Sequence, residues 1–158
     1  NEYPKSWSYY KTIMKNVSAV DTLIFPFDNY WCLLSNICSS QMGEHNSELH
    51  LFLSDDPLSD KWKPNKNNPV IFDSKKGRNG GLFEFHGDLY RVNQIHGKSH
   101  YGKAFGINKI IQLDDETYIE ETVNMVEPSF YPNIKGTHHF DYHENFLIFD
   151  HWQLKRLK

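Results

Sequence analysis

The feature that most constrains the fold is a hairpin pattern that occurs three times along the 158 residues, in units that start near residues 21, 79 and 136. Each unit has an aromatic, extended run, a short polar turn and a second apolar run, the pattern of a two-stranded β-hairpin. Aligning the units puts Asp28, His86 and His143 at the turn, at offsets of 58 and 57 residues. We therefore interpret residues 1–158 as one domain of repeated β units.

The repeat length predicts an all-β, β-propeller-like fold of antiparallel four-stranded blades. Four strands of about 5 to 6 residues plus turns fill roughly 50 to 60 residues. The lead-in repeats as well, because Trp7 and Trp62 precede the first two units at similar spacing. An ordinary β-sandwich or barrel is the alternative. The chain holds about 2.5 to 3 such units, whereas propellers typically have at least about four blades. We expect either missing upstream blades or completion by a second chain, and the start of the chain within a unit favours the first.

Composition excludes some classes of protein. A net charge of −3 with nine His argues against a phosphate-tracking nucleic-acid binder, so we expect no nucleic acid partner. No run reaches the roughly 18 apolar residues of a membrane span, and localisation stays open. We expect Cys32 and Cys38 to be reduced thiols. Aromatic residues make up 15% of the chain, which suits both a core and a sugar-stacking surface.

We expect no cofactor and no metal. The adjacent pair His138-His139 suggests a metal site, but neighbouring residues on a strand point to opposite faces and cannot both reach one ion. We expect His138 to line the ligand-binding site that is described below and His139 to pack within the sheet.

Several short motifs carry a resemblance to a known family. They are, in order, Ala19-Val20-Asp21-Thr22-Leu23-Ile24-Phe25, Tyr30-Trp31-Cys32-Leu33-Leu34, Trp62-Lys63-Pro64, Asn68-Pro69-Val70, Arg78-Asn79-Gly80-Gly81, Leu89-Tyr90-Arg91 with Gln94, and Tyr101-Gly102. Their order and spacing resemble the glycosidase-like five-bladed propeller domain of glucosamine inositolphosphorylceramide transferases and related bacterial proteins. That domain is in turn similar to family 43 glycoside hydrolases. The resemblance covers nearly the whole chain and about the C-terminal three blades of the domain.

The resemblance implies a funnel-shaped site on the propeller axis. By position, Asp21 matches the acid that tunes the pKa of the general acid in family 43-like enzymes; its other interpretation is a turn residue that caps a backbone N–H. Arg78 and Asn79 stand where those hydrolases carry the general-acid Glu. Glycoside hydrolysis normally needs two carboxyl groups, so we expect hydrolase activity to be impaired or absent.

The remaining candidate ligand-binding residues follow from their positions near strand ends. Arg78 could bind a carboxylate or phosphate, or it could be a solvated loop residue. Gln94, His96 and Tyr101 could donate hydrogen bonds to sugar hydroxyls, or they could be satisfied structural groups. With His138, these residues and Asn79 form the expected ligand-binding set.

The sequence thus favours a carbohydrate-active or glycan-binding domain whose partner is a glycan or glycoconjugate. Whether it is an enzyme stays open. The alternative is a non-catalytic interaction or structural module that forms homo-oligomers through open sheet edges.

Overall fold

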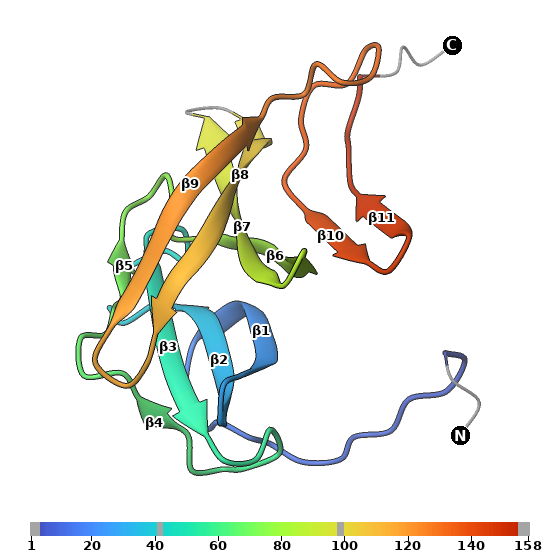
Figure 1. Cartoon of the computed structure of the whole chain (residues 1–158). Coiled ribbons are helices and arrows are strands. Elements are labelled where there is room, and N and C mark those ends of the chain that lie inside the picture. Colours follow the sequence, from blue (N-terminus) through green and yellow to red (C-terminus); the bar gives the residue numbers. More distant parts are fainter. Residues whose placement is uncertain (1–3, 41–42, 98–99, 155–158) are drawn as a thin grey trace.

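The chain is built from antiparallel β-strands. A computed structural model describes residues 4–40, 43–97 and 100–154, which contain eleven strands and no helix (Figure 1). The all-β prediction is confirmed. The strands are β1 (Ala19–Phe27), β2 (Tyr30–Ile37), β3 (Glu48–Ser54), β4 (Lys63–Pro64), β5 (Ile71–Phe72), β6 (Asn79–Phe85), β7 (Asp88–Gly97), β8 (His100–Leu113), β9 (Tyr118–Val126), β10 (Phe140–His143) and β11 (Phe146–Phe149).

The strands form three separate antiparallel sheets. The first has the order β1-β2-β3-β4, with β5 also paired to β3; the second has the order β6-β7-β8-β9; the third is the hairpin β10–β11. None of these sheets closes on itself within the described residues. Each sheet begins with one of the three hairpins that the sequence predicted.

The three hairpins share their turn geometry. Asp28, His86 and Glu144 each follow the last residue of the first strand, and their φ angles are 50°, 52° and 53°. The alignment of His143 with Asp28 and His86 was therefore wrong by one residue. His143 pairs with Phe146 as the last strand residue, and Glu144 takes the first turn position.

A second shared feature is a bulge at the start of the first strand. The register of β1 against β2 shifts between Val20 and Leu23, and that of β6 against β7 shifts between Asn79 and Gly81. Asp21 lies in the first bulge with a φ of 50°. Bulges bend a strand and re-aim its side chains, so both strands change direction near their starts.

The main core lies between the first sheet and β8. Central strand β2 is buried almost throughout because both of its faces are covered. The buried cluster consists of Phe25, Cys32, Leu34, Leu49, Leu51, Leu53, Ile110 and Leu113. Burial, together with the negative charge of Asp28, raises the pKa of the Cys32 thiol to about 12. Cys32 and Cys38 are free thiols.

Strand β6 contacts the first strands of both other sheets, β1 and β10 (Figure 1). Phe83 and Phe85 of β6 meet Phe140 and Tyr142 of β10 edge to face, with ring centroids 5.1 and 5.9 Å apart. Gly81 allows this approach, because a Cβ there would lie 2.0 Å from the carbonyl oxygen of Phe140. Close backbone contact at the starts of these strands brings three repeat units together at one place.

A buried ion pair fixes the loop that leads into β6. Arg91 is fully buried and donates to both carboxylate oxygens of Glu120, from Nε at 2.7 Å and from Nη2 at 2.6 Å. Arg91 also donates to the Lys76 carbonyl at 2.9 Å and to Asn79 Oδ1 at 3.2 Å. The charged pair thereby holds the segment before Asn79 against the second sheet.

The two tryptophans that precede the first two hairpins have different environments, since Trp62 is buried and Trp7 is 79% exposed. Trp62 directly precedes β4, whereas no strand includes the described residues that precede Ala19. The described chain also has no helix that is long and apolar enough to cross a membrane.

Candidate functional site

Polar and aromatic side chains from three repeat units meet near the start of β6. We call this group the polar cluster; it consists of Asp21, Arg78, Gln94, His96, Tyr101 and His138. The strand starts and bulges described above position these residues. The sequence predicted all six, and the structure brings them together.

An ion pair across the first and second units is the centre of the polar cluster. Arg78 Nε donates to Asp21 Oδ2 at 2.7 Å, and Arg78 Nη1 donates to Asn46 Oδ1 at 2.8 Å. Both charged side chains are partly exposed, at 18% for Arg78 and 33% for Asp21. Because the carboxylate compensates the guanidinium, Arg78 is neither a solvated loop residue nor an uncommitted anion site.

The side chain of Gln94 joins this pair to the second sheet. Gln94 Nε2 donates to Asp21 Oδ2 at 3.2 Å and to the Asn79 carbonyl at 2.6 Å, while its buried Oε1 has no hydrogen-bond partner in the part of the chain that the structure describes. Asn79 is buried and donates from Nδ2 to the Asp21 carbonyl at 2.9 Å and to the Leu34 carbonyl at 3.2 Å. Asn79 therefore lies in the joint between β1 and β6, behind the polar cluster.

Three rings form the aromatic side of the polar cluster. His96 and Tyr101 stack with centroids 4.9 Å apart, and Tyr101 meets His138 edge to face at 5.0 Å. The guanidinium carbon of Arg78 lies 5.6 Å from the Tyr101 centroid, a cation–π distance. Tyr101 is nevertheless 59% exposed. It is the large apolar surface that the polar cluster presents to solvent.

His96 is held in its neutral form. Burial lowers the pKa of His96, and the nearby positive charges of Arg78 and His138 lower it further. His96 Nδ1 accepts a hydrogen bond from the Gly102 N–H at 3.1 Å, so the proton of the neutral ring lies on Nε2. That Nε2 is buried and has no acceptor among the described residues.

His138 and His139 do not contribute to the same site, as the sequence predicted for neighbouring residues. His138 Nδ1 forms an ion pair with Asp150, whose Oδ1 also accepts the backbone N–H groups of His138 and His139 at 2.9 and 2.7 Å. His138 thus joins the polar cluster. His139 is exposed and lies outside the strands, so the expectation that it packs within a sheet is wrong.

Sequence reasoning missed two residues that support the polar cluster, Asn46 and Asp150. Asn46 lies in an irregular segment before β3, and Asp150 follows β11, so no periodicity or motif pointed to either. Carboxylates near the polar cluster are already engaged: Asp21 with Arg78, Asp150 with His138, and Glu44 with the Asn46 N–H and the Ser47 hydroxyl. Among the described residues, no three His, Cys, Asp or Glu side chains come together as they would around a metal ion.

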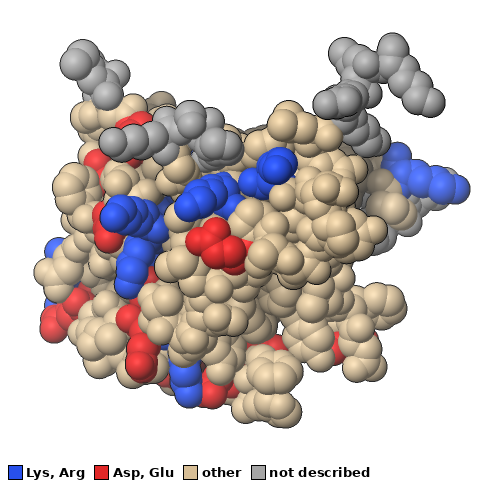
Figure 2. Space-filling model, turned by 90° about the horizontal axis from the view of Figure 1, so that it is seen from above, with Lys and Arg blue, Asp and Glu red and all other residues tan. Residues whose placement is uncertain are grey.

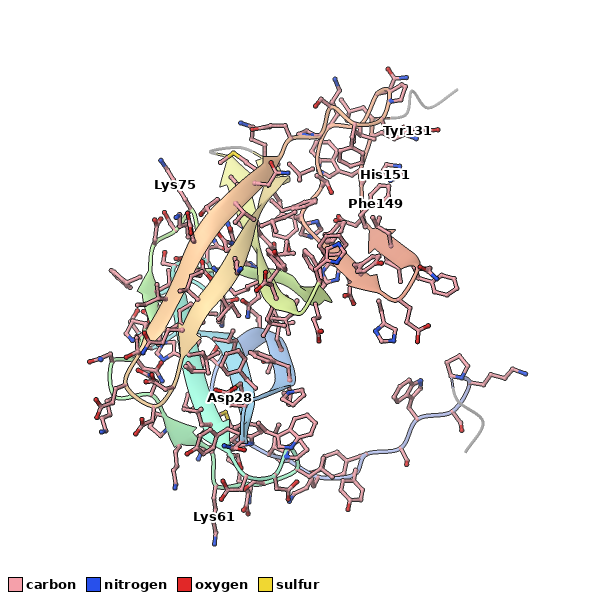
Figure 3. All side chains as sticks on the ribbon, in the orientation of Figure 1. Asp28, Lys61, Lys75, Tyr131, Phe149 and His151 are labelled. Atoms are coloured by element: carbon pink, nitrogen blue, oxygen red, sulfur yellow. The ribbon has the colours of Figure 1, made fainter. Side chains whose placement is uncertain are left out.

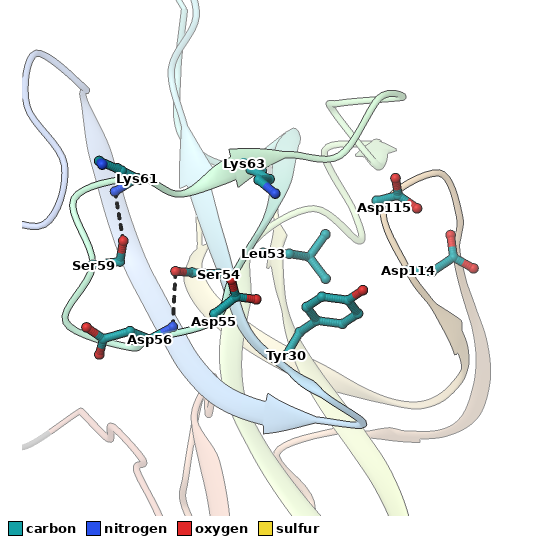
Figure 4. Close-up of a pocket in the computed structure, with 10 residues that line it drawn as sticks. All are labelled: Tyr30, Leu53, Ser54, Asp55, Asp56, Ser59, Lys61, Lys63, Asp114 and Asp115. Atoms are coloured by element: carbon teal, nitrogen blue, oxygen red, sulfur yellow. Dashed lines mark hydrogen bonds between the residues drawn. The ribbon is translucent and has the colours of Figure 1, made fainter.

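A separate concavity lies at the other end of the β1–β2 hairpin, beside the turn (Figure 4). It has a volume of about 450 Å³ and was not predicted from the sequence. Its lining is mixed, with carboxylates and two lysines around one aromatic ring: Tyr30, Leu53, Ser54, Asp55, Asp56, Ser59, Lys61, Lys63, Asp114 and Asp115. The polar cluster contributes no residue to it.

The distribution of charge agrees with the composition. On the face in Figure 2, Lys and Arg side chains lie beside Asp and Glu side chains, and no continuous basic field is seen.

Comparison with known proteins identifies the family. Residues 1–148 match the family described as glucosamine inositolphosphorylceramide transferase 1, N-terminal. The glucosamine inositolphosphorylceramide transferase 1 of Arabidopsis thaliana is 36% identical over 125 residues, which are 77% of this chain and 16% of that protein. The protein of the same name from Oryza sativa subsp. japonica is 32% identical over 127 residues, or 78% of this chain and 17% of that protein. This chain therefore spans about one sixth of these relatives. No solved structure matches it. The chain belongs to the family of the N-terminal region of glucosamine inositolphosphorylceramide transferase 1.

Proposed function

We propose that this chain is part of a glycosidase-like β-propeller domain and that its polar cluster binds a glycan or glycoconjugate. Equivalent hairpins, turns and bulges in successive sheets support the blade assignment, as does the position of β6 between β1 and β10. The relatives are named glucosamine inositolphosphorylceramide transferase 1, and the sugar glucosamine in that name fits a carbohydrate ligand.

The observation that carries the proposal is the convergence of the polar cluster itself. Hydrogen-bonding groups from three repeat units surround one partly exposed aromatic ring, Tyr101. Sugars need this combination, because their C–H faces pack on aromatic rings and their hydroxyls exchange hydrogen bonds with planar polar groups.

The charges of the polar cluster favour an uncharged part of the ligand. Asp21 neutralises Arg78, and Asp150 faces His138. A carboxylate or phosphate would have to displace one of these carboxylates, whereas a hydroxyl group needs no such exchange. We therefore propose neutral sugar rings as the ligand, rather than the anionic group that Arg78 suggested from the sequence.

We propose that the polar cluster binds the glycan without hydrolysing it. Glycoside hydrolysis by the usual route needs two carboxyl groups about 5 to 10 Å apart that flank the bond. Here Asp21 is tied to Arg78 and Gln94, and Arg78-Asn79 occupies the position at which the resemblance to family 43 hydrolases implies an acid.

Titration calorimetry with a panel of neutral mono- and oligosaccharides tests this function, with glucuronic acid and glucose 6-phosphate as anionic comparators. We expect saturable binding of a neutral sugar. Tyr101→Ala should weaken it by about tenfold or more, as truncation of a central aromatic contact does. Tyr30→Ala is the matched control, since Tyr30 is 49% exposed and lines the separate concavity.

Each outcome has a distinct meaning. Unchanged affinity in Tyr101→Ala with a loss in Tyr30→Ala would move the site to the concavity of Figure 4. No heat with any sugar would refute glycan binding by this chain. Preference for the anionic sugars would refute the assignment of a neutral ligand.

A further inference from the structure

Two buried polar atoms of the polar cluster, Gln94 Oε1 and His96 Nε2, have no hydrogen-bond partner among the described residues. Gln94 is only 4% exposed. Both side chains are held in the cluster by their other contacts, Gln94 by its bond to Asp21 and His96 by stacking on Tyr101. Folded proteins leave few buried polar atoms unpaired, because each one costs free energy, so two of them in one proposed site need an explanation.

The surrounding groups determine which atom of each side chain is unpaired. Gln94 Nε2 faces the Asp21 carboxylate and the Asn79 carbonyl, and both of these only accept hydrogen bonds. Turning the amide round would place oxygen against oxygen, so Oε1 is the unpaired acceptor. His96 Nδ1 accepts the Gly102 N–H, which leaves the ring proton on Nε2 as the unpaired donor.

The spacing of the two side chains allows them to share one partner. Gln94 and His96 are two residues apart on β7, so they leave the same face of the strand about 6 to 7 Å apart. One oxygen atom that accepts from one group and donates to the other spans about 5.5 Å. Both unpaired atoms are buried, and side chains fill the space between the second sheet and β10 (Figure 3), so the shared partner must be small.

We propose that Gln94 Oε1 and His96 Nε2 together bind one free hydroxyl group of the glycan. The hydroxyl oxygen accepts from His96, and its proton is donated to Gln94. This inference rests on glycan binding by the polar cluster. It adds a chemical requirement, because the sugar must carry an unsubstituted hydroxyl at the point that meets this pair.

Other chemical groups satisfy only half of the pair. A carboxylate or a phosphate dianion accepts from His96 but has no proton for Gln94, and the ether oxygen of a methylated sugar has the same defect. An ammonium group donates to Gln94 but cannot accept from His96. A site that binds a hydroxyl with buried polar groups rejects an analogue without it, because those groups are then left unpaired.

The polar cluster is open enough for a ligand to approach the pair. Tyr101 is 59% exposed, and the Asp21 side chain is 33% exposed. The ring of His96 stacks on Tyr101 with centroids 4.9 Å apart. A sugar ring that packs on the exposed part of Tyr101 therefore brings its hydroxyl groups beside His96.

Calorimetry with modified sugars tests the proposal on the wild-type protein. The probes are glucose, galactose and mannose, with their monodeoxy and mono-O-methyl derivatives. We expect one ring position at which either change weakens binding by about tenfold or more, because the deoxy sugar lacks both hydrogen bonds and the methyl ether lacks the proton for Gln94. Changes at the other positions should have smaller effects.

Two substitutions of His96 separate this role from a structural one. His96→Gln can place an amide N–H where Nε2–H lies, but it loses the acceptor for Gly102. His96→Asn can place an amide oxygen near the position of Nδ1, where it accepts the Gly102 N–H, but it has no donor at the position of Nε2. We expect His96→Gln to keep the preference for the free hydroxyl and His96→Asn to lose it, so that the parent and deoxy sugars bind within about threefold of each other. His86→Asn is the matched control and should change nothing, because His86 is exposed in the β6–β7 turn outside the polar cluster.

Three results would overturn the proposal. A reversed pattern, in which His96→Asn keeps the preference and His96→Gln loses it, would show that His96 acts only by holding Gly102. Binding of a probe with no position sensitive to both modifications would leave the pair without a ligand hydroxyl, while glycan binding itself would stand. No binding of any named probe would also overturn the inference, and the proposed function fails with it only if the rest of the sugar panel does not bind either.

Discussion

At the residue scale, buried charge determines where the chain is most sensitive to substitution. Arg91 and Glu120 are both buried, at 0% and 7% side-chain exposure, and together they hold the entry to β6. Lys109 and Asp88 form a comparable pair on the surface, at 34% and 43%. The two pairs allow a direct comparison of buried and exposed ion pairs within one sheet.

We predict that Arg91→Met lowers the free energy of unfolding by about 3 kcal/mol or more, because it leaves the Glu120 carboxylate buried without its partner. Lys109→Met should change it by no more than about 1 kcal/mol. Urea denaturation of both variants measures the difference. Equal effects would show that the Arg91 pair is not buried as described.

His96 makes folding sensitive to pH. Burial first, and then the charges of Arg78 and His138, lower the pKa of His96 in the folded state, so the fold favours the neutral ring. Its contribution to stability is therefore complete above the unfolded pKa of about 6.5 and is lost as the pH falls through the lower folded pKa. We expect the wild-type protein to lose more stability than His96→Gln between pH 7 and pH 5. The two urea profiles should converge toward low pH; parallel profiles would contradict a lowered pKa.

At the scale of elements, the hairpins could be predicted from the sequence, but the exact residues of their turns could not. Turn residues and aromatic runs located all three hairpins, because turn chemistry is local. The predicted turn position of the third hairpin was wrong by one residue. Its aromatic residues are spaced 57 residues from those of the second hairpin, whereas the turn residue with positive φ is Glu144 rather than His143. Phe83 and Phe85 lie two residues apart on β6 and so share a face, and both meet β10.

The polar cluster, too, could be predicted only in part. Its six residues followed from repeat position and family resemblance, since each lies at or near a strand end. Its partners Asn46 and Asp150, and the network around Arg91, depend on long-range packing that leaves no periodic signal in the sequence. The commitment of Arg78 to Asp21 could not be predicted for that reason.

The close approach of β6 and β10 gives a prediction for the joint between units. Gly81→Ala should lower the free energy of unfolding by more than about 2 kcal/mol, because its Cβ would lie 2.0 Å from the Phe140 carbonyl oxygen. Gly87→Ala is the matched control. Gly87 also has positive φ, at 81°, but no atom lies within 4 Å of its added Cβ, so it should cost only about 1 to 2 kcal/mol. Thermal denaturation that ranks Gly87→Ala as the more damaging change would contradict this account of the joint.

At the scale of the whole molecule, three sheets of one repeat share a joint, and the polar cluster lies at that joint. Each sheet supplies part of the cluster: Asp21 comes from the first unit, Arg78 to Tyr101 from the second, and His138 from the third. A single unit could not assemble it. The proposed glycan-binding site therefore depends on the assembly of all three units.

The measurement that tests this link most directly is amide chemical-shift mapping during titration with a neutral sugar that binds by calorimetry. We predict that the shifted amides cluster at residues 78–81, 94–97 and 101–102 and at His138, from the second and third units together. Shifts confined to residues 53–63 and 114–115, which line the separate concavity, or an absence of shifts at saturating sugar, would contradict the account.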